Sequence, residues 1–317
     1  MSFEFSEPIL IVGIGGAGSK LAKKATKSLN AHCLIVSNDQ NDLSSDCPSI
    51  HVSTKPIINP TVSLIRGATT QSKSEIMAEV SKYSTVILFA NLAGKSGSAM
   101  APIVSQLSKE ANKNVFSFAI MPFKYEKDRI FSSGIALKRL SANSHCTIVV
   151  DNDGLLQSNP NIVLDDCYEI TNSAMLHVVD SLKQSSISKE TLLLTTGKTE
   201  IDLETSLKDS MKMLYENMPP NSVKHSILYV IGGNNASVGM LNSIADISSS
   251  VLNEQGAQIE MSTISSKESK VVMLSTVQGE TKFDKYDPLG IIPKENQLDW
   301  DDPECSINCN FDLYQLE

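Results

Sequence analysis

Two glycine-rich turns contain the residues of this chain that could bind a phosphate. In the first, "ILIVGIGGAGSKL" (9–21), a strand-forming run leads into glycines and then into a helical pattern. Glycine lets the backbone approach a phosphate closely, and a helix N-terminus adds free N–H groups and positive potential. Gly13, Gly15 and Gly18 fit the pattern G-x-G-x-x-G. This spacing predicts phosphate binding at the end of a strand, although a bare turn without a ligand can share the pattern.

The second turn is "NLAGKSGSAMAP" (91–102), again between a strand-like run and a helix-like run. Its "AGKS" resembles part of a P-loop, but that motif needs glycine at the position of Phe89, so we reject it. The hydroxyls and N–H groups that remain at this helix start suit a second phosphate-binding turn, with a plain helix cap as the alternative. The candidate residues are Gly94, Ser96, Gly97 and Ser98.

The elements that must position these turns alternate between strands and helices. Short apolar runs, typical of buried parallel strands, lie at 9–13, 32–39, 86–91, 114–121 and 145–153. The pattern predicts a doubly wound α/β sheet with its ligand site at the carboxyl ends of the strands. After a long helical pattern from about Leu164 to Lys183, further strand-like runs lie at 191–197, 225–233, 257–265 and 270–278. The last two are joined by a short turn, which predicts mixed parallel and antiparallel pairing.

Composition excludes several classes of protein. The chain has 317 residues and a net charge of −9, which disfavours binding to nucleic acid and to anionic membranes. No apolar run approaches the roughly 20 residues of a membrane span, and the N-terminus "MSFEFSEP" lacks the basic residues of a secretion signal. These features predict a cytoplasmic protein without membrane insertion. The six cysteines indicate reduced thiols, and Cys305 with Cys309 lacks the further ligands of a metal site.

Four motifs in order resemble the tubulin/FtsZ superfamily. "GIGGAGSK" is similar to its first glycine loop, "LAGKSGSAMAPIV" to its Gly-Gly-Gly-Thr-Gly-Ser/Thr-Gly signature, "MPFKYEKDR" (121–129) to its ribose-binding loop, and "NDGLL" (152–156) to its Asn-Asp-x-Leu-Leu motif. The similarity continues through "SILYVIGGNNASVGMLNSIADISSSVLNEQGAQI", so it extends from Pro8 to Gln278. The chain therefore resembles a divergent FtsZ-like protein.

This resemblance implies the domain organisation. We expect a Rossmann-like nucleotide-binding domain with a parallel sheet at 1–163, a core connecting helix at 164–185 and a second, smaller α/β domain at 186–285. Residues 286–317 form an acidic tail. From Lys294 onward it holds seven acids and one lysine, which predicts disorder.

The resemblance also implies the site residues and the ligand. The ligand would be GTP or GDP, with Mg²⁺ carried by the nucleotide. Glu126 and Arg129 would contact the ribose, Asn152 would bond the guanine edge, and Tyr168 would stack on the base, with Asn172 nearby. The residues implied at the phosphates are Gly13, Gly15, Gly16, Ala17, Gly18, Gly94, Ser96, Gly97 and Ser98.

Several positions depart from the family pattern. Lys20 replaces an asparagine, and Ala93, Lys95 and Ala99 replace glycines of the phosphate signature. At the position of the base-reading aspartate on the long helix we assign Ser173, next to Asn172. Serine cannot accept hydrogen bonds from both guanine N–H groups, so this assignment weakens the expected selectivity for guanine.

The family's catalytic loop has no clear counterpart. Aligning "TEIDLETSL" with its Asn-x-Asp-x-x-Asp acids would use Glu200, Asp202 and Thr205 and lose the last acid. We prefer an alignment in which "TLLLTTG" is the first strand of the second domain, which leaves only "QSSISKE" (184–190) in place of the loop and its helix. Weak or absent GTP hydrolysis is expected, because positioning the attacking water supplies much of the rate of phosphoryl transfer. No catalytic residue is assigned.

The favoured interpretation is a guanine-nucleotide-binding subunit of a cytoskeletal or cell-division filament. The resemblance implies head-to-tail self-association and a protein partner that binds the tail. Two alternatives stay open. A Rossmann-type NAD(P)-dependent oxidoreductase would use the first glycine turn with Asp39 as its ribose acid. A scaffold with an emptied nucleotide site is favoured by Lys20, Lys95 and Ser173.

Overall fold

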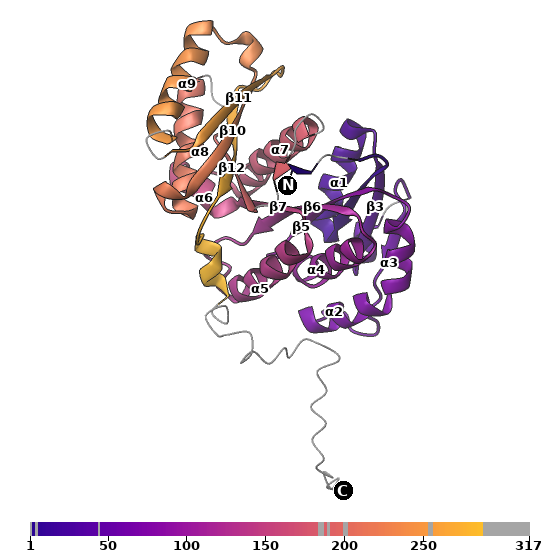
Figure 1. The fold of residues 1–317 in the computed structure, drawn as a ribbon. Helices are drawn as coiled ribbons and strands as arrows, with labels where there is room; N and C mark the ends of the chain where they lie inside the picture. Colours follow the sequence, from indigo (N-terminus) through magenta and orange to yellow (C-terminus); the bar gives the residue numbers. More distant parts are fainter. Residues whose placement is uncertain are drawn as a thin grey trace, which may run out of the picture.

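The computed structural model describes residues 2–3, 6–43, 45–182, 187–188, 191–198, 202–252 and 256–287. One ten-stranded sheet runs through both halves of the chain, in the order β11-β10-β12-β9-β7-β6-β5-β2-β3-β4 (Figure 1). The first half supplies six strands that pair in parallel: β2 (Ile9–Ile14), β3 (His32–Ser37), β4 (Ser49–His51), β5 (Thr85–Asn91), β6 (Asn114–Met121) and β7 (Cys146–Asp151).

The second half extends the same sheet with mixed pairing, as predicted. Its strands are β9 (Thr191–Thr196), β10 (Val223–Ile231), β11 (Gln258–Ile264) and β12 (Lys270–Val277). Strand β9 lies parallel to β7, β12 runs antiparallel to both β9 and β10, and β11 is parallel to β10. The predicted domain boundary therefore falls within a continuous sheet.

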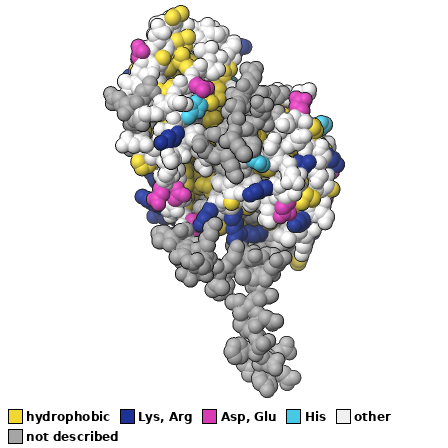
Figure 2. Space-filling model, viewed as in Figure 1, with side chains coloured by type: hydrophobic (Ala, Val, Ile, Leu, Met, Phe, Trp, Pro, Cys, Tyr) yellow, Lys and Arg dark blue, Asp and Glu magenta, His cyan; other side chains and the backbone are white. Residues whose placement is uncertain are grey.

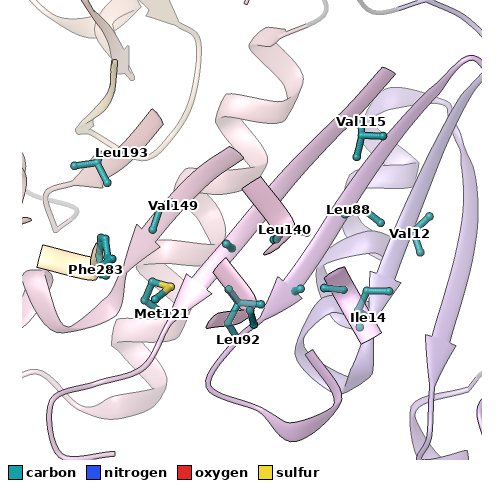
Figure 3. Close-up of a cluster of buried hydrophobic side chains, with 14 of the residues drawn as sticks. Val12, Ile14, Leu88, Leu92, Val115, Met121, Leu140, Val149, Leu193 and Phe283 are labelled. Atoms are coloured by element: carbon teal, nitrogen blue, oxygen red, sulfur yellow. The ribbon is translucent and has the colours of Figure 1, made fainter. Parts of the chain in front are cut away.

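Helices cover both faces of the sheet, which confirms the doubly wound architecture. Along β2, Ile9 and Ile11 pack into one cluster with α1 (Gly15–Leu29) and α7 (Leu164–Leu182). Leu10, Val12 and Ile14 pack into the opposite cluster (Figure 3). The helices of that second face are α2 (Val62–Gln71), α3 (Lys73–Val80), α4 (Lys95–Glu110), α5 (Lys127–Asn143), α8 (Leu203–Asn217) and α9 (Val238–Leu252). Burial on both faces explains the nearly continuous apolar runs of the strands.

Some elements carry too weak a pattern to be predicted. They are β4, α2, α3, α6 (Asn152–Ser158), the short 3-10 helices η1 (Gln40–Asp42), η2 (Pro220–Ser222) and η3 (Gly233–Asn235), η5 (Lys282–Tyr286), and the two-residue pair β1 (Ser2–Phe3) with β8 (Ile187–Ser188). Tyr286 and Asp287, assigned to the tail, lie in the packed part of the chain. The rest of the predicted tail, with Cys305 and Cys309, lies outside the described residues.

The surface shows no strong separation of charge over most of the visible face. Acidic, basic and hydrophobic side chains are mixed there, with several Lys and Arg side chains gathered near its lower middle (Figure 2). Within the described ranges, no helix has the length and apolar character needed to span a bilayer.

Candidate functional site

The two predicted phosphate turns meet at the carboxyl ends of β2 and β5. Helix α1 starts at Gly15 and α4 starts at Lys95, and neither helix start has a side-chain cap. Gly15 has a φ of +64°, and a Cβ at this position would lie 2.9 Å from the Cβ of Ser96. The turns therefore touch, and two uncapped helix N-termini face the same region, which is favourable for an anion.

Three of the candidate glycines are required by packing. A Cβ on Gly18 would lie 2.2 Å from the backbone oxygen of Phe89, and one on Gly97 would lie 2.0 Å from that of Asn91. A Cβ on Gly13 would lie 2.6 Å from the oxygen of Gly18. These contacts hold each helix directly against the sheet, so the glycine pattern has a structural cause as well as a predicted phosphate-binding role.

The polar candidate side chains differ in whether their hydrogen-bonding groups are already used within the protein. Ser96 donates its hydroxyl to Oδ1 of Asn38 at 2.5 Å, next to the first turn. Ser98 is buried and donates to the carbonyl of Gly94 at 2.9 Å, so its hydroxyl proton is used within its own helix. Ala17 is exposed at the start of α1. Lys95 donates to Oδ1 of Asn59 at 2.8 Å and stays exposed.

Asp42 is a residue of this site that the motifs did not reveal. Its Oδ2 accepts a hydrogen bond from Ser37 Oγ at 2.6 Å. A Cβ on Gly16 would lie 2.7 Å from Asp42 Oδ1, so the carboxylate lies against the start of α1. The sequence feature that could have indicated Asp42 is the polar run "NDQND" (38–42), which follows the second strand of the chain's first half. Asp39 in the same run caps η1 by accepting from the backbone N–H of Asn41 at 2.9 Å.

The loop after β6 forms the other end of the site. Glu126 accepts from the backbone N–H of Phe123 at 3.1 Å and from Arg129 Nη1 at 2.8 Å. The Phe123 ring stacks on Tyr125 with centroids 5.3 Å apart and meets Tyr168 edge-on at 5.8 Å. Burial raises the pKa of Tyr168, with Tyr125 and Glu126 adding to the effect. Glu126, Arg129 and Tyr168 therefore lie near one another.

Asn152 and its neighbours connect this end to β7. Asn152 is 2% exposed, and its Oδ1 has no hydrogen-bond partner among the described residues. Cys167 Sγ donates to the Asn152 carbonyl at 3.6 Å, which joins Asn152 to the helix that carries Tyr168. Asp153 accepts from the backbone N–H of Lys124 at 3.1 Å and pairs with Lys124 Nζ at 3.2 Å, which fixes the adjoining loop.

Ser173, assigned to the base-reading position, has its hydroxyl engaged by other side chains. Ser173 accepts from Lys270 Nζ at 2.9 Å and donates to Oε2 of Glu268 at 3.3 Å, so its side chain contacts the second half of the sheet. The physical reason is that the ammonium group of Lys270, 1% exposed, needs nearby acceptors. Asn172, half-buried, follows Tyr168 by one helical turn and shares its side of the helix.

The preferred alignment takes "TLLLTTG" as a strand, and the structure forms β9 there. "TLLLTTG" begins with β9, and only eight residues, 183–190, separate it from the end of α7. Asp202, from the alternative alignment, caps α8 and accepts from the backbone N–H of Glu204 at 3.1 Å and from Thr205 Oγ1 at 2.6 Å. Glu200 and most of 184–190 lie outside the described residues.

Comparisons with known proteins point to one family. A family model described as "Tubulin/FtsZ family, GTPase domain" matches residues 61–160. "Cell division protein FtsZ 2" of Methanocaldococcus jannaschii is 24% identical over 195 residues, which is 57% of this chain and 50% of that protein. The protein of the same description from Halobacterium salinarum is 22% identical over 276 residues, covering 77% of this chain and 69% of that protein. This chain is thus similar to FtsZ proteins, and its residues 61–160 match the GTPase domain of the tubulin/FtsZ family.

Solved structures share the fold of this FtsZ-like chain. "FtsZ dimer, empty (M. jannaschii)" has a TM-score of 0.69 at 18% identity, covering 86% of this chain and 88% of that one. "CetZ2 from Haloferax volcanii - GTPgS bound protofilament" has a TM-score of 0.63 at 15% identity, covering 88% and 96%. The oxidoreductase alternative is not supported, because the matches are to this family and Asp39 acts as a cap.

The match to the GTPase-domain model covers much of the FtsZ-like site. Residues 61–160 contain the second turn, the Glu126 loop and Asn152. The first turn and Tyr168 lie outside the matched range. The contact between Gly15 and Ser96, and the ring contact between Phe123 and Tyr168, bring these parts together in space.

Proposed function

We propose that this FtsZ-like chain binds a guanine nucleotide at the carboxyl ends of β2, β5, β6 and β7, and acts as a subunit of a cytoskeletal or cell-division filament. The observation that carries the proposal is the buried Oδ1 of Asn152, which has no partner among the described residues. A buried acceptor without a donor is costly, so a ligand that supplies a donor gains affinity there. The N1–H and 2-amino groups of guanine are such donors.

The rest of the ligand fits the neighbouring groups. The aromatic ring of Tyr168 offers a stacking face for a purine, and the carboxylate of Glu126 is held in place by Arg129 for contact with ribose hydroxyls. The helix starts at Gly15 and Lys95 receive the phosphates, and Lys95 adds a positive charge beside them. Mg²⁺ would arrive with the nucleotide.

We propose that Asn172 takes part in reading the base in place of Ser173. Its amide offers one acceptor oxygen and one donor nitrogen, whereas a carboxylate offers acceptors alone. An asparagine therefore presents one acceptor oxygen to the two guanine N–H groups, whereas an aspartate presents two. Relaxed selectivity for guanine follows from this difference, while the Ser173 side chain contacts Lys270.

The proposal also covers filament assembly and GTP hydrolysis. The subunits would associate head to tail in the cytoplasm, and a protein partner would bind the tail. The short connection between α7 and β9 leaves little room for the acids that position a hydrolytic water, so hydrolysis would be weak or absent. A filament of this kind would depend on a partner for disassembly, because its bound nucleotide would not change.

The test replaces Asn152. Asn152→Ala removes the unpartnered acceptor and its donor group, and we expect it to weaken GTP binding by about tenfold, the effect of one lost hydrogen bond of about 1.4 kcal/mol at a buried site. Asn143→Ala is the matched control, because Asn143 lies at the end of α5, where its side chain donates to the carbonyl of Arg139 of the same helix at 3.0 Å. Equal GTP affinity of both variants in equilibrium binding, with unfolding midpoints unchanged, would refute the role of Asn152.

A further inference from the structure

A buried ion pair connects the end of β7 to the last described segment of the chain. Asp151, 1% exposed, pairs with Lys282 of η5, whose side chain is 17% exposed. Asp151 also accepts from the backbone N–H of Asp153 at 3.2 Å and thereby caps the first turn of α6. Asn152, the proposed contact to the base, is the residue between these two aspartates. Its backbone is therefore anchored on both sides.

Residues 279–287, which we call the return segment, pack back onto α5 of the first half. Phe283 lies in the core cluster near Val149 and Met121 (Figure 3). A Cβ on Gly134 of α5 would lie 2.7 Å from the backbone of Tyr286. Lys138 of α5 pairs with Asp287 at 3.3 Å. The return segment appears in yellow beside α5 in Figure 1, at the end of the described chain.

Part of the return segment does not pack directly against α5. A cavity of about 650 Å³ lies between it and α5, with Leu137, Thr281 and Asp284 in its lining. Phe283, Tyr286 and two lysine–carboxylate pairs attach the segment to the rest of the protein. Of the two pairs, the one with Lys282 reaches the residue next to Asn152, whereas the one with Lys138 does not. The two pairs differ in their connection to the nucleotide site.

We propose that Asp151 and Lys282 are positioning residues for Asn152, so that the return segment and the base end of the nucleotide site are energetically coupled. This inference rests on the proposed function of the site. If the Lys282 ammonium group moves away or is removed by substitution, Asp151 is left as a buried carboxylate without its cation. It must then move toward water or become protonated. Either change alters the cap of α6 and with it the orientation of Asn152. Because coupling is reciprocal, a bound nucleotide must stabilise the return segment by the same factor.

The coupling gives the tail a connection to the nucleotide. Residues 288–317 follow directly after the return segment in the sequence. A nucleotide that holds Asn152 favours the state in which Lys282 stays paired with Asp151.

The test compares two lysine variants in the full-length protein. Lys282→Met and Lys138→Met each remove one cation that holds the return segment, but only Lys282 contacts Asp151. We expect Lys282→Met to weaken GTP binding by about five- to tenfold and to reduce the preference for GTP over ATP, within the usual range of coupling between sites. Lys138→Met should change GTP affinity less than twofold. A merely structural role would lower stability in both variants and leave the GTP-to-ATP ratio unchanged.

A double variant separates positioning from general destabilisation. Asp151→Asn keeps an oxygen that can cap Asp153 but removes the charge, so the combination of Asp151→Asn with Lys282→Met leaves no buried unpaired carboxylate. It should recover most of the GTP affinity that Lys282→Met loses. Failure of this rescue, or equal loss in the two lysine variants, would overturn the inference.

Hydrogen exchange supplies the reciprocal measurement. In the wild-type protein, GTP should slow amide exchange in residues 279–287, and in Asn152→Ala this protection should be lost. A wild-type protein that does not bind GTP would refute the proposed function and the inference with it. A wild-type protein that binds GTP without protecting the return segment would refute the inference alone.

Discussion

At the scale of single residues, the glycines of the two turns combine packing with a predicted role at the phosphates. Gly18 and Gly97 allow helices to lie directly against strand backbones, whereas Gly15 needs its left-handed φ of +64°. The sequence pattern identified both turns because it records these backbone requirements. It could not identify Asp42, since a carboxylate has no fixed spacing to a glycine turn.

The packing role of Gly18 gives the first stability prediction. Gly18→Ala places a Cβ 2.2 Å from a backbone oxygen of β5, so the strand or α1 must shift, and we expect a loss of about 1–3 kcal/mol in the free energy of unfolding. Gly67→Ala in α2 is the control, because nothing lies within 4 Å of its new Cβ. It should gain about 0.5–1 kcal/mol from helix propensity. Urea unfolding measures both, and equal stabilities would contradict the account.

Glu268 gives a stability prediction that depends on pH. Its hydrogen bond to Lys270 lowers the pKa of Glu268 below its ordinary value of 4.5. A lowered folded-state pKa means that the stabilisation is present above about pH 4.5 and is lost as pH falls through the folded-state pKa. Glu268→Gln should therefore unfold more easily than wild type at pH 7, and the difference should shrink in acid.

Thermal unfolding between neutral pH and about pH 3 checks this prediction. Glu280→Gln, at an exposed glutamate of the return segment, is the control and should leave the midpoint unchanged at neutral pH. If the unfolding midpoint of Glu268→Gln equals that of the wild type at every pH, the contact with Lys270 contributes nothing to stability.

At the scale of elements, strand prediction succeeded because buried parallel strands have a strong apolar signal. The predicted runs at 9–13 and 86–91 correspond to β2 and β5 within a residue. The contacts of Ser173 were not predicted, because the sequence pattern did not define the exact rotation of its helix. Its neighbour Lys270 is distant in the sequence, so only the structure reveals why a serine stands there.

The short link between α7 and β9 predicts slow hydrolysis. With GTP bound, phosphate release should stay low and should not rise steeply with protein concentration, because the short link between α7 and β9 leaves little room for acids that position the attacking water. Asp202→Ala separates the two alignments. Because Asp202 caps α8, its replacement should lower the free energy of unfolding slightly and leave phosphate release unchanged. A steep rise with concentration that Asp202→Ala abolishes would establish the alternative alignment.

At the scale of the whole molecule, the two predicted halves share one sheet. β7 and β9 pair in parallel across the predicted boundary, and the return segment adds a second connection through Asp151 and Lys282. The sequence indicated both halves and their elements, because each has its own hydrophobic periodicity. It did not indicate their union, since neither strand pairing nor a long-range ion pair leaves a local pattern. The family match and the shared fold agree with the resemblance of the four motifs.

A competition titration tests whether this FtsZ-like chain binds a guanine nucleotide. Fluorescent GTP is titrated with the purified wild-type protein, and unlabelled GTP, GDP, ATP and NAD are added as competitors. The account predicts displacement by GTP and GDP at lower concentrations than by ATP, with NAD without effect. Displacement by NAD alone, or no binding of GTP at any protein concentration, would contradict it.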